Sequence, residues 1–435
     1  MRNASHGFRT GLLRLAVAIA PIAGLAACDD LLDVQAPSRV SVDVLDLPAS
    51  AQLLVDGARA GFGCALQAHI NGNALLTDEM DDTQLAAAAW DWDRRSWTGA
   101  VGQAYAESPC DAGQIFGTYR PLQTARYAAD DAVRRLGNFT EEEVPARTAL
   151  QAEANLFAGY SRILLGEGFC SIAIDLGPEI QPAEVFAQAE QYLTDAITLA
   201  TTAGDNDIVN AARVGRARAR VALARLPGAA VNAGKYAEAR ADAAAVPAGF
   251  EYEMPYNANS SFARNNIAFR NRNGLLYSVG TAFQTINDPR IKVTNSNQRG
   301  ADAVTTVWWA DKYPDQESPI TLASYKEAQL IIAEAELAAG NPDGAITVLN
   351  ALRGRAGVGL PPYAGPNDAA SVQAFLLSER RLELYLEGQR FWDINRFNLP
   401  LSPPAGTPYP GKGGTYGDLR CLPLPDIERI NNPNL

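Results

Sequence analysis

Histidine, the side chain that most often serves as a proton carrier near neutral pH, is scarce in this sequence. The 435 residues include two histidines, and His6 falls in an N-terminal segment with the features of a cleaved leader. A site of several histidines is therefore excluded, and any Ser-His-Asp or Cys-His catalysis would depend on His69. No catalytic signature surrounds His69, which precedes Ile70-Asn71-Gly72. We interpret His69 as a surface or loop histidine.

An acidic run occurs at Asp78, Glu79, Asp81 and Asp82. A glycoside hydrolase needs two carboxylates across a cleft, and a calcium ion needs several oxygen ligands. Nothing in the spacing singles out a catalytic pair or a set of ligands, and a solvated loop is the favoured interpretation. The sequence therefore predicts no catalytic residue, no metal site and no cofactor.

The overall charge narrows the range of partners. The formal net charge is −12, and the isoelectric point is about 4.8. An acidic chain gains no advantage from counterion release on nucleic acid, so we expect no DNA or RNA partner. The same sign disfavours anionic ligands, unless a local basic pocket overrides the overall field.

The N-terminus has the order of a bacterial lipoprotein leader. Three arginines come before any acidic residue, an apolar stretch of small residues covers 15–27, and Leu25-Ala-Ala-Cys28 resembles a lipobox. We expect residues 1–27 to be a signal peptide, Cys28 to be acylated and 28–48 to be a tether. Several acyl chains on one thiol would hold the protein at a membrane. The alternative is an ordinary signal peptide followed by a chance cysteine.

Four further cysteines remain after Cys28. A secreted chain meets an oxidising compartment, so an even number permits up to two disulfides. We predict that Cys64 pairs with Cys110 and that Cys170 pairs with Cys421. Free buried thiols are the alternative, and the spacing matches no zinc pattern.

Amphipathic helices are expected through most of the chain. Apolar residues and alanines recur at helical spacing in Thr118 to Leu136, Glu141 to Leu165, Pro182 to Ala203 and Ile208 to Leu226. Helical scaffold is predicted at 117–247 and 320–397, within a single domain over residues 49–435.

Two later segments repeat a five-residue step from glycine to alanine. Gly234 precedes Ala239, and Gly340 precedes Ala345. Each glycine is expected to end one helix with a positive φ, and each alanine to start the packing face of the next. This arrangement is typical of tetratricopeptide-like hairpins. The predicted fold is mainly α, with helical hairpins, loop-rich insertions and a few short strands.

Two segments lack a helical period, namely 61–114 and 249–319. The second is rich in Asn, Ser and aromatic residues, with short strands expected around Leu275 to Val279 and Val304 to Trp308. Long irregular segments in a compact domain are usually functional or disordered. We expect these two segments to face a ligand.

The C-terminal third carries the most specific pattern. Residues 378–396 read SERRLELYLEGQRFWDINR, which resembles the hallmark segment of the SusD/RagB family. The preceding hairpin at 333–357 is similar to the helix pair of that family. Asp288-Pro-Arg290, Lys312-Tyr313 and the closing segment 423–435 also follow the family's order.

Taken alone, the residues of the hallmark segment indicate a structural role. Glu379, Glu383 and Glu387 share a helix face, and spacing allows ion pairs between Arg380 and Glu383 and between Glu387 and Arg390. A charge network that maintains the fold is favoured over acid-base catalysis.

The resemblance implies a function. A SusD-like lipoprotein would sit on the outer-membrane surface, capture a nutrient such as an oligosaccharide, and pass it to a TonB-dependent transporter without catalysis. The alternatives are a helical-repeat scaffold that binds only proteins and, least favoured, a glycoside hydrolase that uses two carboxylates.

Tryptophans are the ligand contacts that this function suggests, because their flat apolar faces cover the C–H side of a sugar ring. Alternation in an extended strand would put two of them, at 90 and 92, on one side. Two adjacent ones, at 308 and 309, would point to opposite faces. Ordinary core packing is the alternative for each. The candidates are Trp90, Trp92, Trp97, Trp308 and Trp309.

Overall fold

The computed structural model describes residues 41–85, 87–96, 110 and 117–435. The chain divides into two units, residues 1–47 and 48–435. In the first, the described part contains one short helix, α1 (Val42–Leu45). The proposed signal peptide and lipidated Cys28 lie outside the described residues, as does Trp97. Among the residues that are described, none of the helices is long and apolar enough to span a membrane.

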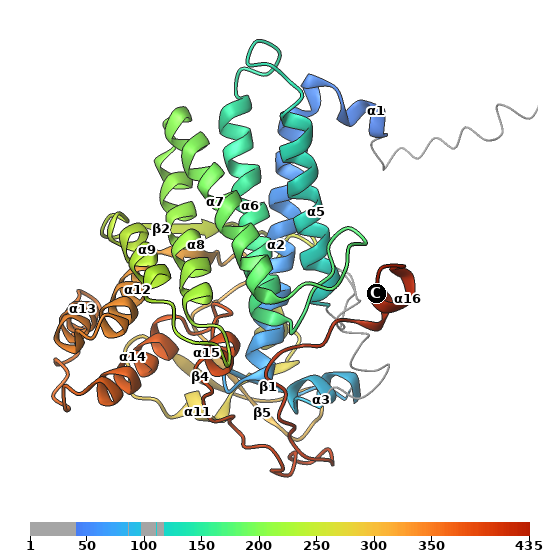
Figure 1. Cartoon of the computed structure of the whole chain (residues 1–435). Helices are drawn as coiled ribbons and strands as arrows, with labels where there is room; N and C mark the ends of the chain where they lie inside the picture. The colour runs from blue at the N-terminus through green and yellow to red at the C-terminus, as the bar shows by residue number, and fades with distance from the viewer. Residues whose placement is uncertain (1–40, 86, 97–109, 111–116) are drawn as a thin grey trace, which may run out of the picture. The chain divides into compact units, whose positions relative to one another are not determined.

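The second unit is mainly helical, which confirms the predicted fold class (Figure 1). The helices described in it are η1 (Pro48–Ser50), α2 (Ala51–Leu76), α3 (Ala87–Asp93), α5 (Tyr119–Leu136), α6 (Arg147–Gly168), α7 (Pro182–Ala203), α8 (Asn206–Ala224), α9 (Ala233–Ala244), α10 (Asn266–Ala268), η2 (Phe269–Asn273), α11 (Thr281–Gln284), α12 (Tyr325–Ala338), α13 (Pro342–Gly354), α14 (Ala369–Glu383), α15 (Arg390–Arg396) and α16 (Asp426–Asn431).

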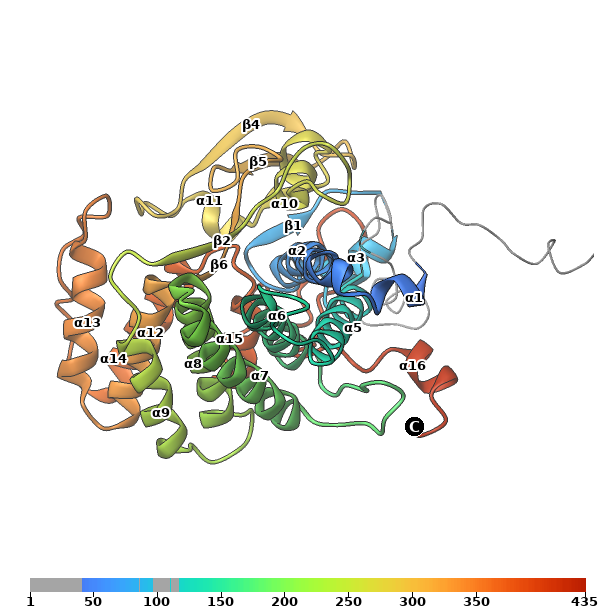
Figure 2. The same cartoon turned by 90° about the horizontal axis from the view of Figure 1, so that it is seen from above.

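The long helices form a row in which each contacts the next. The order is α2, α5, α6, α7, α8, α9, α12 and α13, and α14 closes against α12 and α13. Figure 2 shows this row from above, with the segment from β2 to β6 along one side of it. The row crosses the sequence gap between α9 and α12, so the two predicted scaffold regions form one continuous frame.

Glycines allow the helices of this row to approach closely. A Cβ on Gly159 of α6 would lie 2.6 Å from Cγ of Leu193 on α7, and a Cβ on Gly215 of α8 would lie 2.8 Å from the ring of Tyr160. Real atoms do not pack that closely, so these positions accept only a hydrogen. The helix contacts therefore depend on small residues, as expected for paired helices.

The two repeated glycine-alanine steps have different outcomes. Gly340 has φ +76° directly after α12, as predicted. Gly234 instead lies inside the first turn of α9, which Asn232 caps through its side chain, so the prediction for this glycine was wrong. Ala239 and Ala345 are both fully buried, in agreement with their expected packing role.

Three short antiparallel strand pairs occur among the described residues. They are β1 (Met80–Asp82) with β3 (Tyr277–Val279), β2 (Glu251–Met254) with β6 (Ile320–Ser324), and β4 (Val293–Arg299) with β5 (Thr306–Ala310). Segment 249–319 contains only short elements, as expected. Segment 61–114 was assigned wrongly at its start, because the 26-residue helix α2 continues to Leu76. Its many small and polar residues hid the helical period, since almost every side of the helix is buried.

Paired charges are buried beneath the hallmark segment. Arg396 binds both Glu334 and Asp393, and Arg380 binds Asp393 at 2.8 Å. Burial alone would raise the pKa of Asp393, but the two arginines outweigh it and lower that pKa to about 2. The expected charge network therefore exists with other partners: Glu383 binds Arg290 and Arg355, and not Arg380.

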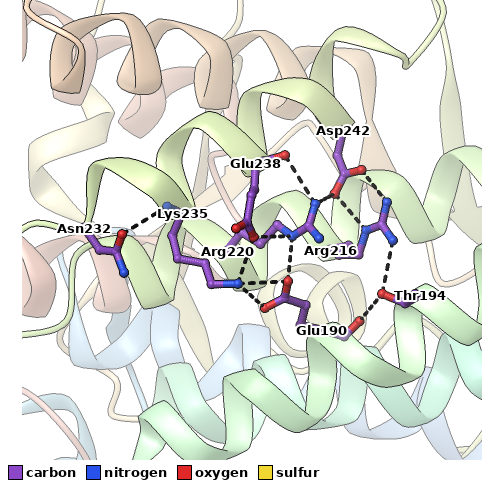
Figure 3. Close-up of polar contacts among 8 residues, drawn as sticks. All are labelled: Glu190, Thr194, Arg216, Arg220, Asn232, Lys235, Glu238 and Asp242. Atoms are coloured by element: carbon purple, nitrogen blue, oxygen red, sulfur yellow. Dashed lines mark hydrogen bonds and ion pairs between the residues drawn. The ribbon is translucent and has the colours of Figure 1, made fainter.

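A second network joins the outer faces of three helices (Figure 3). Arg216 of α8 binds Asp242 of α9 at 2.6 Å, and Arg220 binds Glu190 of α7 at 2.8 Å. Lys235 of α9 also binds Glu190, at 2.9 Å. These side chains are 8–27% exposed, and together they connect α7, α8 and α9.

Two disulfides join distant parts of the unit. Cys64 pairs with Cys110, and Cys170 pairs with Cys421, with Cα–Cα distances of 5.9 and 5.1 Å. These are the two pairs named from the sequence. The second joins the C-terminal segment to the end of α6, where Phe169 and Leu422 also form an isolated bridge.

We expect Gly159→Ala to destabilise the protein and Gly57→Ala to stabilise it. The added methyl at 159 would collide with Leu193, whereas a Cβ at Gly57 of α2 meets nothing within 4 Å. Gly159→Ala should lower the free energy of unfolding by about 1–3 kcal/mol, because the core becomes overpacked. Gly57→Ala should raise it by about 0.5–1 kcal/mol, because alanine favours a helix over glycine. Urea unfolding followed by circular dichroism measures both. Equal effects of the two changes would contradict the packing described for α6 and α7.

Candidate functional site

A pocket of about 240 Å³ lies where strand β1, helix α11 and the C-terminal segment meet. We call it the aspartate pocket. It is lined by Asp78, Asp81, Asp82, Asp93, Thr281, Ala282, Thr305, Ser402, Pro403, Tyr409, Pro410, Lys412 and Tyr416.

Pairing of β1 with β3 positions the first wall of the pocket. Asp81 and Asp82 lie on β1, opposite Ser278 and Tyr277. The chain then passes through Gly280, where a Cβ would lie 2.2 Å from the carbonyl oxygen of Asp78. Only glycine permits this approach. It brings Thr281, at the start of α11, within reach of Asp81.

Asp81 is the partly exposed carboxylate of the pocket. Its Oδ2 accepts hydrogen bonds from the backbone N and the Oγ1 of Thr281, at 3.2 and 3.3 Å. Within the described parts of the chain it forms no ion pair. Burial raises the pKa of Asp81 to about 6, although the bonds from Thr281 act in the opposite direction. At neutral pH it is a charged acceptor that forms no ion pair, although the ammonium of Lys412 is near enough to lower its pKa.

Asp93 and Asp82 form the floor. Oδ2 of Asp93 accepts from the backbone N of Asp82 and from the hydroxyl of Tyr409, both at 2.8 Å. Burial, and then the carboxyls of Asp81 and Asp82, raise the pKa of Asp93 well above its ordinary value. Lys412 binds Asp82 at 3.3 Å. These two carboxyls are therefore held by groups of the protein.

Asp78 connects the pocket to the hallmark segment. It pairs with Arg381 at 2.8 Å and with Arg390 at 3.1 Å. The neighbouring Glu79 is buried and accepts a 2.9 Å bond from the backbone N of Leu386. Burial raises the pKa of Glu79 to about 7. The acidic run is thus a buried strand edge, and the solvated loop expected from the sequence was wrong.

Aromatic rings border the pocket. The ammonium of Lys412 lies 5.8 Å from the ring centres of both Trp90 and Tyr409. Tyr409 meets Tyr416 edge to face at 5.2 Å, and Arg95 lies 5.0 Å from the Tyr416 ring. The half-buried Trp90 anchors its indole N–H on the carbonyl of Gln84. Carboxylates, an ammonium and aromatic faces therefore meet in one small volume.

The structure separates the candidate tryptophans. Trp90 does not line the aspartate pocket itself, but its ring centre lies 5.8 Å from the ammonium of Lys412, which does. Trp92 is 1% exposed and donates to the carbonyl of Gly72, so it belongs to the core. Residues 87–93 form helix α3, and the extended strand expected for Trp90 and Trp92 was wrong. Trp308 and Trp309 lie on β5, away from the pocket lining, and both are half-buried.

His69 is not a surface residue, contrary to the expectation. It is 2% exposed in α2, and its Nε2 lies 3.2 Å from the carbonyl of Gly388. Burial, with the nearby charge of Arg218, lowers the pKa of His69 to about 3. It is a neutral core residue. Across the described ranges, no group of three or more His, Cys, Asp or Glu side chains converges as a metal site would require.

Sequence reasoning missed the part of the pocket that the C-terminal segment supplies. Tyr409, Lys412 and Tyr416 lie in a stretch rich in glycine and proline, and no motif marks them. Lys412 reaches β1 only in the folded chain, where its ammonium donates a 2.8 Å bond to the carbonyl of Asp82. The one local indication was a lysine in a chain with few of them.

Comparisons with known proteins agree on one family. A model described as the SusD family matches residues 260–418. A SusD-like protein of Formosa agariphila is 38% identical over 88 residues, which covers 19% of this chain and 18% of that relative.

Solved structures share the fold over most of the chain. A SusD homolog from Bacteroides thetaiotaomicron has a TM-score of 0.66 at 16% identity and covers 92% of this chain and 98% of its own. A SusD-like carbohydrate binding protein from Bacteroides vulgatus has a TM-score of 0.62 at 15% identity, with 89% and 97% covered. Residues 260–418 therefore match the SusD family in sequence, and the fold of SusD-like structures extends over most of the chain.

Proposed function

We propose that this protein is a lipid-anchored glycan-binding protein of the outer-membrane surface, which captures an oligosaccharide and passes it to a TonB-dependent transporter. The match of residues 260–418 to the SusD family supports the class of function, and one structural relative is itself described as carbohydrate binding. The lipobox at Cys28 supports the anchor. The transporter partner rests on the family resemblance.

We place the sugar at the aspartate pocket. Sugar hydroxyls need acceptors, and their ring C–H faces need flat apolar surfaces. Asp81 supplies a charged acceptor without an ion-pair partner, and Trp90 supplies a half-exposed indole beside Lys412. Asp81 forms no ion pair and lines the pocket together with the rings of Tyr409 and Tyr416, and this is the observation that carries the proposal.

The same carboxylates support binding and not hydrolysis. Glycoside hydrolysis needs one carboxyl as acid and a second as base or nucleophile. Asp78 and Asp82 are paired with Arg381, Arg390 and Lys412. Asp93 has the raised pKa of an acid, but it is 3% exposed and its Oδ2 is bonded to the hydroxyl of Tyr409. Asp81 is left without a second free carboxylate in the lining.

Calorimetry against a panel of neutral oligosaccharides tests the site. At least one should bind saturably, and Trp90→Ala and Asp81→Ala should each weaken it by about tenfold or more, because each removes a direct contact. Tyr127→Ala is the matched control, since Tyr127 is 59% exposed on α5. No binding by any sugar, or equal loss in the control, would exclude this site. Mass spectrometry should find every bound sugar uncleaved.

Affinity for that sugar should rise with pH between 5 and 7. Asp81 loses its proton near pH 6, and a hydroxyl donates more strongly to a carboxylate than to a neutral acid. The gain should be about fivefold, from roughly 1 kcal/mol. In Asp81→Asn the profile should be flat. If the affinity of Asp81→Asn still rises with pH as in the natural protein, a group other than Asp81 titrates.

Cys28→Ser should release the protein from the membrane, because the thiol that accepts the acyl chains is absent. Palmitate labelling of cells followed by fractionation measures this. Cys64→Ser is the matched control and should stay labelled, since Cys64 lies in a disulfide. Labelling that persists in Cys28→Ser would disprove the anchor.

A further inference from the structure

Three of the five lysines in the chain line one pocket. A second hollow, of about 370 Å³, lies between the 289–292 segment, the end of β5 and the loop after α13. We call it the lysine pocket. It is lined by Pro289, Arg290, Lys292, Asp311, Lys312, Lys326, Arg355, Ala356, Gly357, Val358, Leu382, Glu383 and Tyr385. Its volume falls in the range of small-molecule sites, roughly 300–1,000 Å³.

The three glutamates of the hallmark segment are the most deeply buried charges of this region. The side chains of Glu379, Glu383 and Glu387 are 2%, 1% and 4% exposed. The side chains of Lys326 and Arg355 above them are 27% and 30% exposed. These glutamates therefore lie behind the cations, and Asp311, the exposed carboxylate of the lining at 31%, is paired with Arg272.

The cations also exceed the carboxylates in number. Seven cations occupy the pocket and its ion-paired surroundings, against six carboxylates, which leaves one positive charge in a chain of net charge −12. The cations are Arg272, Arg290, Lys292, Lys312, Lys326, Arg353 and Arg355, and the carboxylates are Glu251, Asp288, Asp311, Glu379, Glu383 and Glu387.

Two of the lysines have uncommitted donors. Lys292 is exposed and forms no ion pair with any residue that the structure describes. Lys326 lies 3.7 Å from Glu387 and 3.9 Å from Glu251, which is beyond hydrogen-bond range. The attraction of Glu387, against the cost of burial, raises the pKa of Lys326, so it is charged at neutral pH.

The kind of free donor defines the ligand. Planar guanidinium groups suit carboxylates, but those of Arg290 and Arg355 are engaged by Glu383. The available groups are lysine ammoniums, which act as point charges and, unlike a guanidinium, do not require the bound anion to lie in one plane with them. A tetrahedral oxyanion with several charges fits such an arrangement.

The charge differs between the two sides of Lys312 and Lys326. Lys312 and Lys326 also border a cavity of about 530 Å³ whose other charged residues are all acidic. They are Glu251, Glu253, Asp315 and Glu317. An anion is therefore disfavoured on that side of the two lysines and favoured in the lysine pocket.

We propose that the lysine pocket binds a sulfate or phosphate group of a small ligand through Lys292 and Lys326. The site is separate from the aspartate pocket and does not depend on the proposed glycan site. It supplies this acidic protein with one local position for an anion.

The test is calorimetry of the purified protein with inorganic sulfate and with inorganic phosphate, at ionic strength held constant with sodium chloride. One saturable site is expected. In the double variant Lys292→Gln/Lys326→Gln its affinity should fall by about tenfold or more. Galactose 6-sulfate and glucose 6-phosphate then distinguish the two sources of the anion.

The matched control is Lys235→Gln/Arg240→Gln, which removes the same charge from α9 and should leave anion affinity unchanged. Thermal unfolding verifies that both variants fold. No saturable binding of either anion, or equal weakening in the control, would overturn the proposal. Binding of a neutral sugar, measured in the same variants, reports on the aspartate pocket alone, so failure of one site is distinguishable from failure of the other.

Discussion

The buried glutamates of the hallmark segment impose the main constraint on this structure. Removing a carboxylate from water costs several kcal/mol unless cations surround it. Here the cations come from distant parts of the chain: Glu383 needs Arg290 and Arg355, and Glu387 needs Lys312. Burial would raise the pKa of Glu387, but Lys312 and Lys326 lower it, so it stays charged. The helical frame and the irregular segment must therefore fold together.

Both pockets are consequences of this constraint. The aspartate pocket is connected to the hallmark segment through Asp78, whose partners Arg381 and Arg390 flank the buried glutamates in sequence. The lysine pocket is the outer surface of the same network, where cations that hold the glutamates face solvent. The same set of buried charges therefore positions residues of both the acidic cavity and the basic one.

The frame could be predicted from sequence because its information is local. Helices α5, α7 and α8 follow the apolar spacing to within two residues, and Gly340 ends α12 as its turn chemistry requires. Helix α2 could not be recognised, because a helix buried on nearly all sides loses its polar stripe. The aspartate pocket was beyond reach, since Asp81 and Tyr409 meet only through the tertiary fold. The sequence pattern around Trp90 and Trp92 also could not show that Trp92 is a core residue and that Trp90 is half-buried.

The composition of the irregular segment is also explained by what its side chains do. Asparagine favours turns because its amide can replace backbone partners. The Nδ2 of Asn271 donates to the carbonyls of Tyr277 and Trp308, and its Oδ1 accepts from the backbone N of Ala310, all at 2.9 Å. Asn265 likewise donates to the carbonyl of Ser318. These amides take the place of the sheet ladder that such short strands lack. A segment held in this way keeps its backbone fixed without a continuous sheet ladder.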